Sequence, residues 1–218
     1  MDQSYQRPLD MRGLKFIYYG MLVGLFSFLF TGVVTLVISF GKFILMIYGL
    51  YQLCKTDLCF RSPWNWCWSC MTFSLIDLGI TLWFVFTQHA YPWWLLVIMS
   101  IGGTILYILY IRALCKSIAI MTHQTGQNAQ IEPIIWSRWR WFWMSQAAYI
   151  LVYIIYALGI RFQLFNIAFI VQLLSVVSLF VLTWLIAMFN ACYMALNNQY
   201  RLYPDYTNQT LGDGKKKK

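Results

Sequence analysis

Between Phe16 and Arg201 the chain is almost continuously apolar, and this feature constrains its fold more than any other. The residues are 61% hydrophobic and 11% charged, whereas a soluble globular domain has roughly 25% charged residues. Six successive apolar stretches of ~20 residues, the length of a helix that crosses a bilayer, use over half of the chain. The sequence therefore predicts an all-α, polytopic transmembrane helix bundle with no room for a soluble catalytic domain.

The predicted spans pair as three hairpins, with a polar inner loop at residues 121–135 between the second and third pairs. The spans are expected at residues 14–34, 38–54, 64–86, 93–118, 141–159 and 165–195. The second span is the least distinct, because Lys42 is the only charge between residues 16 and 54. An alternative with residues 38–54 in the interface and five spans stays open. In the six-span prediction, residues 1–13 form an N-terminal tail, residues 14–196 the transmembrane domain and residues 197–218 a basic C-terminal tail.

The basic residues give the bundle an orientation. If the chain crosses six times, all sixteen Lys and Arg residues except Lys42 and Arg161 fall on one side. Basic residues in short loops collect on the cytoplasmic side, so both termini are predicted to be cytoplasmic and Lys42 to lie at the outer end of its span. The partner expected for this side is an anionic inner leaflet, which attracts each nearby basic residue by about 1 kcal/mol. No basic stripe on a soluble face predicts a nucleic-acid partner.

Tryptophans gather where predicted spans begin, as in the aromatic belts of membrane proteins. They are Trp64, Trp66, Trp68, Trp93, Trp94, Trp136, Trp139, Trp141 and Trp143. The run from Trp136 to Trp141 alternates with Arg138 and Arg140, so it also fits a site where cations and aromatic rings hold a lipid headgroup or a nucleic acid. Interfacial anchoring is the preferred interpretation, since every cluster lies at a span end.

Asp77 is the one acidic residue in the interior of a predicted span. A charged Asp near the midplane costs ~2.5 to 3.5 kcal/mol on insertion scales. Ser74, Asp77 and Thr81 recur at intervals of three and four, which places them on one helix face. The residues predict either a site in a permeation path for protons, ions or small solutes, or a protonated Asp that hydrogen-bonds a neighbouring helix. Both hypotheses stay open.

Small residues at intervals of four predict close helix packing, which drives helix association in lipid. Gly20 and Gly24 form such a pair in the first span, and Ala187 and Ala191 belong to a small-residue stripe in the sixth. The stripes do not distinguish packing within one chain from self-association or contact with other membrane subunits.

The cysteines predict neither a metal site nor disulfides. Cys54, Cys59, Cys67 and Cys70 could in principle hold zinc, but structural zinc sites use two short knuckles farther apart. Packing or palmitoylation is the better interpretation of these thiols. No catalytic motif and no cofactor-binding motif occurs, so the chain is not expected to be an enzyme or to carry a cofactor.

The segment from Ile47 to Phe60 contains G-L-Y-x-L-x-K-x-D-x-x-F at the end of the second predicted span. It resembles uncharacterised small multi-span membrane proteins of bacteria. The resemblance covers about the first third of the chain and implies a bacterial cytoplasmic membrane. The terminal run Lys215 to Lys218 is instead similar to the dilysine retrieval signal of proteins of the endoplasmic reticulum membrane, which is the alternative location.

Two functions follow as hypotheses. The first is a non-enzymatic binding or assembly component of a membrane complex, because packing motifs are plentiful and reactive constellations are absent. The alternative is a small-solute or ion permease subunit with Asp77 in the path, which resembles in size and helix number the substrate-binding components of vitamin transporters. The two differ in whether Asp77 faces a cavity or a dry helix contact.

Overall fold

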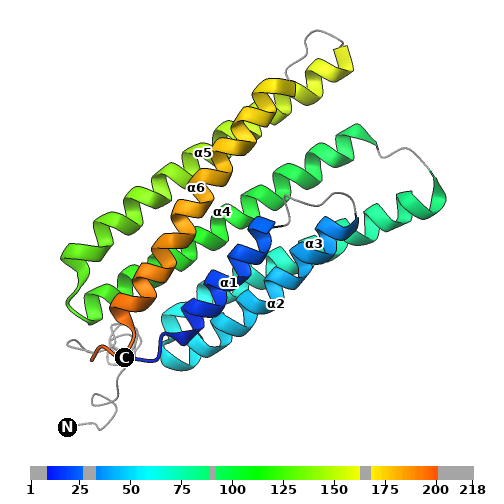
Figure 1. Ribbon diagram of the computed structural model, residues 1–218. Coiled ribbons are helices and arrows are strands. Elements are labelled where there is room, and N and C mark those ends of the chain that lie inside the picture. The colour runs from blue at the N-terminus through cyan, green and yellow to red at the C-terminus, as the bar shows by residue number, and fades with distance from the viewer. Residues whose placement is uncertain (1–8, 27–32, 89–91, 163–167, 201–218) are drawn as a thin grey trace, which may run out of the picture.

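The computed structural model describes residues 9–26, 33–88, 92–162 and 168–200, and every regular element in them is a helix (Figure 1). The α-helices are α1 (Arg12–Phe26), α2 (Val33–Thr56), α3 (Arg61–Thr87), α4 (Trp93–Gln124), α5 (Asn128–Phe162) and α6 (Ala168–Leu196), and a short 3-10 turn, η3 (Leu58–Phe60), precedes α3. The predicted all-α class with six helices is confirmed. Most of the predicted tails, residues 1–13 and 197–218, lies outside the described residues.

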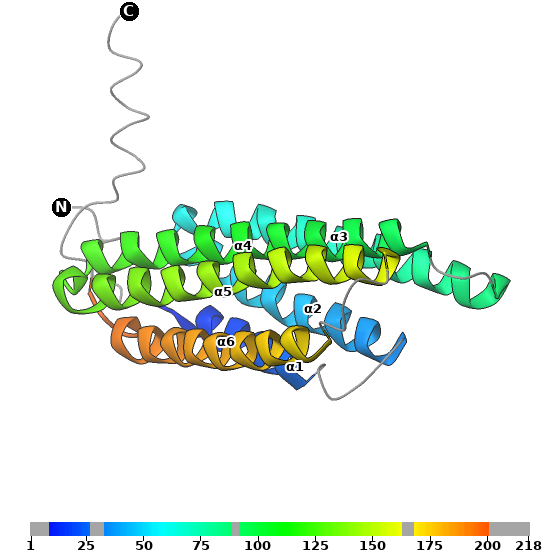
Figure 2. The ribbon, with the colours of Figure 1, turned by 90° about the horizontal axis from the view of Figure 1, so that it is seen from above.

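The six helices form a closed ring. Each helix packs against the next along the chain, as the predicted hairpins require, and α6 packs against α1. Figures 1 and 2 show that the helices run side by side along one long axis. Backbone hydrogen bonds fasten the closure, since Leu9 N donates to Gln199 O at 2.9 Å and Asn198 N donates to Leu9 O at 3.0 Å. The two ends of the described chain therefore lie at the same end of the ring.

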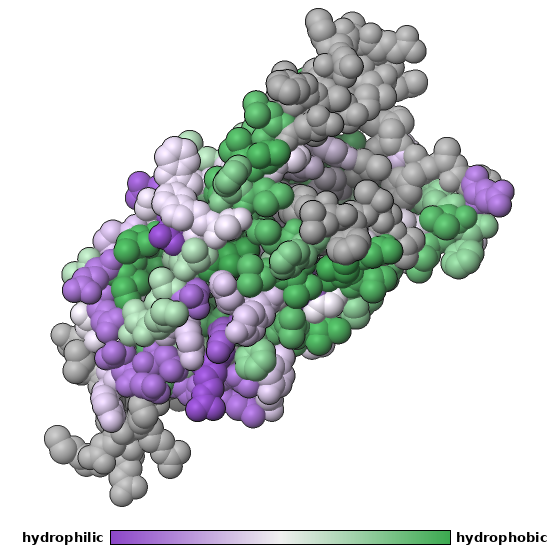
Figure 3. All heavy atoms as spheres, in the orientation of Figure 1, coloured by the Kyte–Doolittle hydropathy of each residue, from purple (hydrophilic) through white to green (hydrophobic). Residues whose placement is uncertain are grey.

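The outside of the ring is apolar along most of its length. Four described segments are long and apolar enough to cross a membrane: Val37–Thr56, Leu58–Thr87, Val97–Gln124 and Leu173–Leu196. Large side chains on them point outward, with Phe86 81% and Phe180 73% exposed. In Figure 3 the hydrophilic residues gather at the end where the chain begins, while hydrophobic residues cover the body. Such a surface is compatible with a lipid environment, whereas in water it would drive association.

The predicted polar loop at residues 121–135 is wrong, because helix continues through most of it. Helix α4 ends at Gln124 and α5 begins at Asn128. Gly126 has φ 73°, and the hydrogen bonds Gln127 N to Thr122 O (2.9 Å) and Gly126 N to His123 O (3.2 Å) form a Schellman motif, which ends a helix at a left-handed glycine. The polar composition of this segment reflects helix ends outside the apolar zone and not a long loop.

Helices α1 and α2 approach closely because glycines remove the side chains between them. A Cβ atom added at Gly49 would lie 2.5 Å from the carbonyl oxygen of Gly13, and one added at Gly20 would lie 2.9 Å from the carbonyl oxygen of Lys42. Gly20 therefore packs as its spacing suggests, while the contact of Gly13 with Gly49 has no counterpart in the sequence prediction. Backbone contact of this kind is how small residues hold helices together in lipid.

The small residues of α6 do not face the ring. Ala187 and Ala191 are exposed in the single chain, so among the described residues they make no close helix contact, and their predicted role in packing against another subunit stays a prediction. Larger residues on the opposite side fill the interface of α6 instead: Leu185, Met188, Phe189, Cys192 and Leu196 are buried. Regular spacing of alanines occurs on both faces of an apolar helix, and only the position of the neighbouring helices distinguishes them.

Gly20→Ala should lower the thermal stability of the protein in nonionic detergent. The added methyl group meets Met46 and the backbone of α2, and overpacking of this kind costs about 1 to 3 kcal/mol. Gly79→Ala is the matched control, because a Cβ there meets nothing within 4 Å. Equal melting temperatures for the two variants would show that α1 and α2 are not held at this distance.

Candidate functional site

Lys42 lies inside the ring and not at the outer end of its span, where the charge pattern placed it. Because α2 begins at Val33, Lys42 is about 14 Å along the helix at ~1.5 Å per residue. Its Nζ atom lies 5.0 Å from the ring centroid of Phe43 and 5.4 Å from that of Tyr107 on α4. Among the residues that the structure describes, no hydrogen bond or ion pair joins the Lys42 ammonium to another group. The Lys42 ammonium is therefore in cation–π contact with the faces of these two aromatic rings.

Gly24 gives Lys42 its room. A Cβ atom at Gly24 would lie 2.8 Å from Cδ of Lys42 and 3.7 Å from Nζ. The lysine stem thus crosses α1 where α1 has no side chain. Gly24 was predicted as a helix-packing residue, and the structure shows that what packs on it is the side chain of a cation.

On one side of Lys42 is a cavity of about 270 Å³ whose wall is formed by residues of five helices. It is lined by Met21 and Gly24 (α1), Lys42 (α2), Ser100, Thr104 and Tyr107 (α4), Phe142, Gln146 and Tyr149 (α5), and Ser175, Ser178 and Leu182 (α6). The Oγ atom of Ser178 is buried and has no hydrogen-bond partner among the residues that the structure describes. Buried polar atoms normally have partners, so this hydroxyl could bond a group that enters the cavity.

On the other side is a cavity of about 240 Å³ between α2, α3 and α4, which contains Asp77. Lys42, Ser39, Cys70, Ser74 and Asp77 lie on its wall. The structure thus brings Asp77 and Ser74 together and adds a cation that the sequence analysis placed elsewhere. Thr81, the third residue of the predicted site, is not among the residues that line this cavity.

The two cavities share a wall. Lys42, Ser100, Thr104 and Tyr107 line both of them. Thr104 Oγ1 donates to the Ser100 carbonyl oxygen at 2.8 Å, so this hydrogen bond within α4 fixes the orientation of the Thr104 hydroxyl. Lys42 is the one charged residue common to both walls, and Asp77 and the 270 Å³ cavity lie on opposite sides of it. The arrangement places one ammonium within reach of two polar spaces inside an apolar ring.

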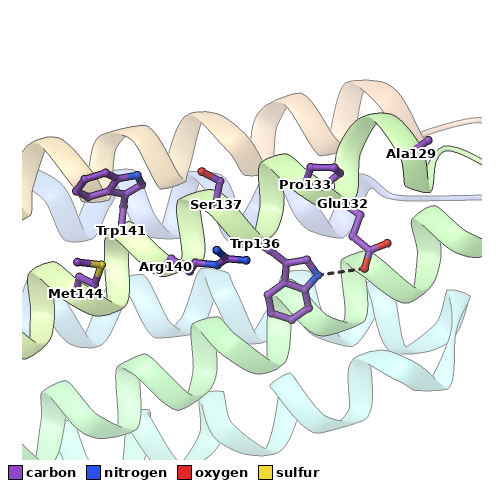
Figure 4. A pocket seen from close by; sticks show the side chains of 8 residues that line it. All are labelled: Ala129, Glu132, Pro133, Trp136, Ser137, Arg140, Trp141 and Met144. Atoms are coloured by element: carbon purple, nitrogen blue, oxygen red, sulfur yellow. Dashed lines mark hydrogen bonds between the residues drawn. The ribbon is translucent and has the colours of Figure 1, made fainter.

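A larger hollow of the described surface lies elsewhere and is more open. It has about 730 Å³ and is lined only by residues of α5, among them Glu132, Trp136, Arg140 and Trp141 (Figure 4). Trp136 Nε1 donates to Glu132 Oε1 at 3.2 Å, and Glu132 also pairs with His123 at 2.9 Å. One helix cannot surround a solute, so this groove belongs to the outer surface, where the predicted tryptophan anchors lie.

The six cysteines, all within the described ranges, form no disulfide with one another. Cys67 and Cys70 are buried, while Cys54 and Cys59 are half-buried. Cys59 joins η3 to α4, since Ser117 Oγ donates to the Cys59 carbonyl at 2.7 Å. Within the described ranges no three metal-ligating side chains come together.

Comparisons with known protein families, curated proteins and solved structures found no match. The two cavities at Lys42 are therefore the features of the described residues that point to a function. The sequence analysis missed Lys42, Tyr107, Gln146 and Ser178 as site residues. A signal for them exists, because each is polar or charged within a predicted span, but such positions become a site only when the ring brings five helices together.

Lys42→Met should raise the melting temperature of the protein in nonionic detergent. A methionine keeps the length of the side chain and removes an ammonium that has no hydrogen bond, and replacing buried charge by apolar groups often stabilises by about 1 kcal/mol or more. Lys15→Met removes the same charge from an exposed position of α1 and should change little. A clear loss of stability in Lys42→Met alone would show that Lys42 is a structural residue.

Proposed function

We propose that this chain is a multi-pass membrane protein that binds a small solute inside its helix ring, as a permease or as the solute-binding subunit of a membrane complex. It acts without catalysis. The observation that carries the proposal is the pair of polar cavities that meet at Lys42, in a ring whose outer face is apolar. Convergent polar groups in an enclosed space are typical of small-molecule sites, and polar residues at membrane depth are typical of solute pathways.

The proposal includes six spans, with the start of α1 and the end of α6 both on the cytoplasmic side. The four apolar helical segments support it, and so does the pairing of Leu9 with Gln199, because two chain ends on one side require an even number of crossings. Arg12, Lys15, Lys55 and Arg61 lie near this end of the ring, which is where basic residues collect in cytoplasmic loops. The resemblance of residues 47–60 to small multi-span membrane proteins of bacteria favours a bacterial cytoplasmic membrane.

Solute binding is better supported than assembly alone. Gly20 and Gly24, two of the residues that suggested assembly, contact α2 of the same chain and are not free for another subunit. Ala187 and Ala191 remain exposed on α6 and fit contact with a further membrane subunit, which is compatible with a solute-binding component of a larger complex.

The orientation can be tested with single added cysteines. Gln88 ends α3 in an exposed left-handed turn (φ 53°), and Gln127 lies in the turn at the opposite end, between α4 and α5. In intact cells, Gln88→Cys should react with a membrane-impermeant maleimide above the level of the unmodified chain, and Gln127→Cys should react only after lysis. The reverse pattern would invert the proposed topology.

Solute access to the ring can be tested with adjacent positions on α6. Ser178→Cys places a thiol at the cavity wall, whereas Val177→Cys places it on the exposed, lipid-facing side, where Val177 is 44% exposed. A small charged methanethiosulfonate reagent needs a hydrated thiolate, so it should modify Ser178→Cys several times faster than Val177→Cys, as read by mass spectrometry. If Ser178→Cys is as slow as Val177→Cys, the cavity is a dry helix contact and the solute-binding proposal fails.

A further inference from the structure

Lys42 lies on the wall of the 270 Å³ cavity, and none of the described residues that line this cavity is acidic. A lone charge at membrane depth is unfavourable, and charged residues there usually pair with one another. Asp77 is on the wall of the neighbouring cavity, but no ion pair joins it to Lys42. When Lys42 is protonated, the larger cavity therefore carries a positive charge that one negative charge would balance.

The other polar groups of this cavity suit the same ligand. A carboxylate only accepts hydrogen bonds, and it takes them best from charged donors and hydroxyl groups. Lys42 supplies an ammonium, Ser178 has a buried hydroxyl without a partner in the described part of the chain, and Gln146 and Tyr149 supply further donors. A cationic solute would instead meet Lys42 with repulsion and find no carboxylate.

The single cation and the cavity size limit the ligand further. A phosphate dianion is commonly held by several charges or by the fork of an arginine, and no arginine lines this space. A volume of about 270 Å³ corresponds to about nine waters at ~30 Å³ each, which suits a solute with on the order of ten non-hydrogen atoms. Tyr107, Phe142 and Tyr149 provide aromatic walls for an apolar body.

We propose that this cavity binds a small monocarboxylate whose anionic group is held by Lys42. The inference rests on the proposed solute-binding function and names its ligand class. Asp77 has a defined part in it. Because Lys42 lines both cavities and its stem is a flexible four-carbon chain, Asp77 competes with the bound carboxylate for the same ammonium. Binding holds the ammonium in the larger cavity, and Asp77 on the wall of the smaller cavity is its alternative partner.

Calorimetric titration of the purified full chain in nonionic detergent tests the ligand class. The probe is benzoate, which has nine non-hydrogen atoms, and benzamide is the uncharged probe of the same shape. Protein-free micelles provide the blank. Benzoate should bind at least about 30-fold more tightly than benzamide, the equivalent of about 2 kcal/mol and the lower end of what a buried charge partner contributes. Equal binding of both, or binding of neither, overturns the proposal.

Three variants locate the binding. Lys42→Met should weaken benzoate binding to the level of benzamide, and Lys15→Met, which removes the same charge from the exposed side of α1, should leave it unchanged. Asp77→Asn should tighten benzoate binding, because it removes the competing carboxylate and keeps the shape. Unfolding curves of each variant verify that it is folded. Benzoate binding that survives Lys42→Met, or that weakens in Asp77→Asn, contradicts the assignment.

This experiment and the thiol-access experiment fail separately. Fast modification of Ser178→Cys with no preference for benzoate would leave a hydrated solute site and reject its anion selectivity. Slow modification of Ser178→Cys would reject the site itself, whatever benzoate does.

Discussion

In hydrocarbon, a backbone amide finds no water to bond with, and the rest of this structure follows from that constraint. Each segment within the membrane must satisfy its own backbone, so it is a helix. Irregular backbone is then confined to the ends, as at the Schellman turn around Gly126 and the left-handed residue Gln88. Since lipid attracts apolar side chains as well as protein does, helices are held together by close packing and by polar contacts.

The ring meets these requirements in different ways on its two sides. Between α1 and α2 the packing is close, because Gly13, Gly20 and Gly49 allow backbone to meet side chain and backbone. Between α3 and α4 a glycine again allows close packing, since the aromatic side chain of Phe73 lies against Gly102. Around Lys42 the packing is interrupted, and two cavities remain. Tight packing and a cavity thus occur along the same helix, α2. Gly24 on α1 contributes to both, because its missing side chain leaves room for Lys42.

The fold was largely predictable because its cause lies in composition. Long apolar stretches and terminal basic residues predict helices and their number from local sequence alone. The boundaries were less predictable, since the polar residues after Met121 fit either a loop or the exposed ends of two helices. The hydrogen bonds from Gly126 and Gln127 show that α4 ends here, and no single residue type in the sequence predicts these bonds.

The candidate site was predictable only in part. Asp77 and Ser74 were identified because an acidic residue in an apolar span is conspicuous and Ser74 follows the helical period. Lys42 was visible but misplaced, because the prediction started the helix at residue 38 and turned a buried cation into a terminal one. The outward face of Ala187 and the inward face of Ser178 could not be separated by sequence, since both are small residues on one apolar helix.

The pairing of Leu9 with Gln199 has a consequence for how the protein is made. A ring that α6 closes against α1 has no complete interior until α6 has left the ribosome. In the proposed topology the hairpins enter the membrane in order, so Lys42 would be inserted before the hydroxyls of α6 that share its cavity have been translated. The early helices must therefore hold a lysine in the bilayer without those groups, and the aromatic faces of Phe43 and Tyr107 are what the first four helices offer it.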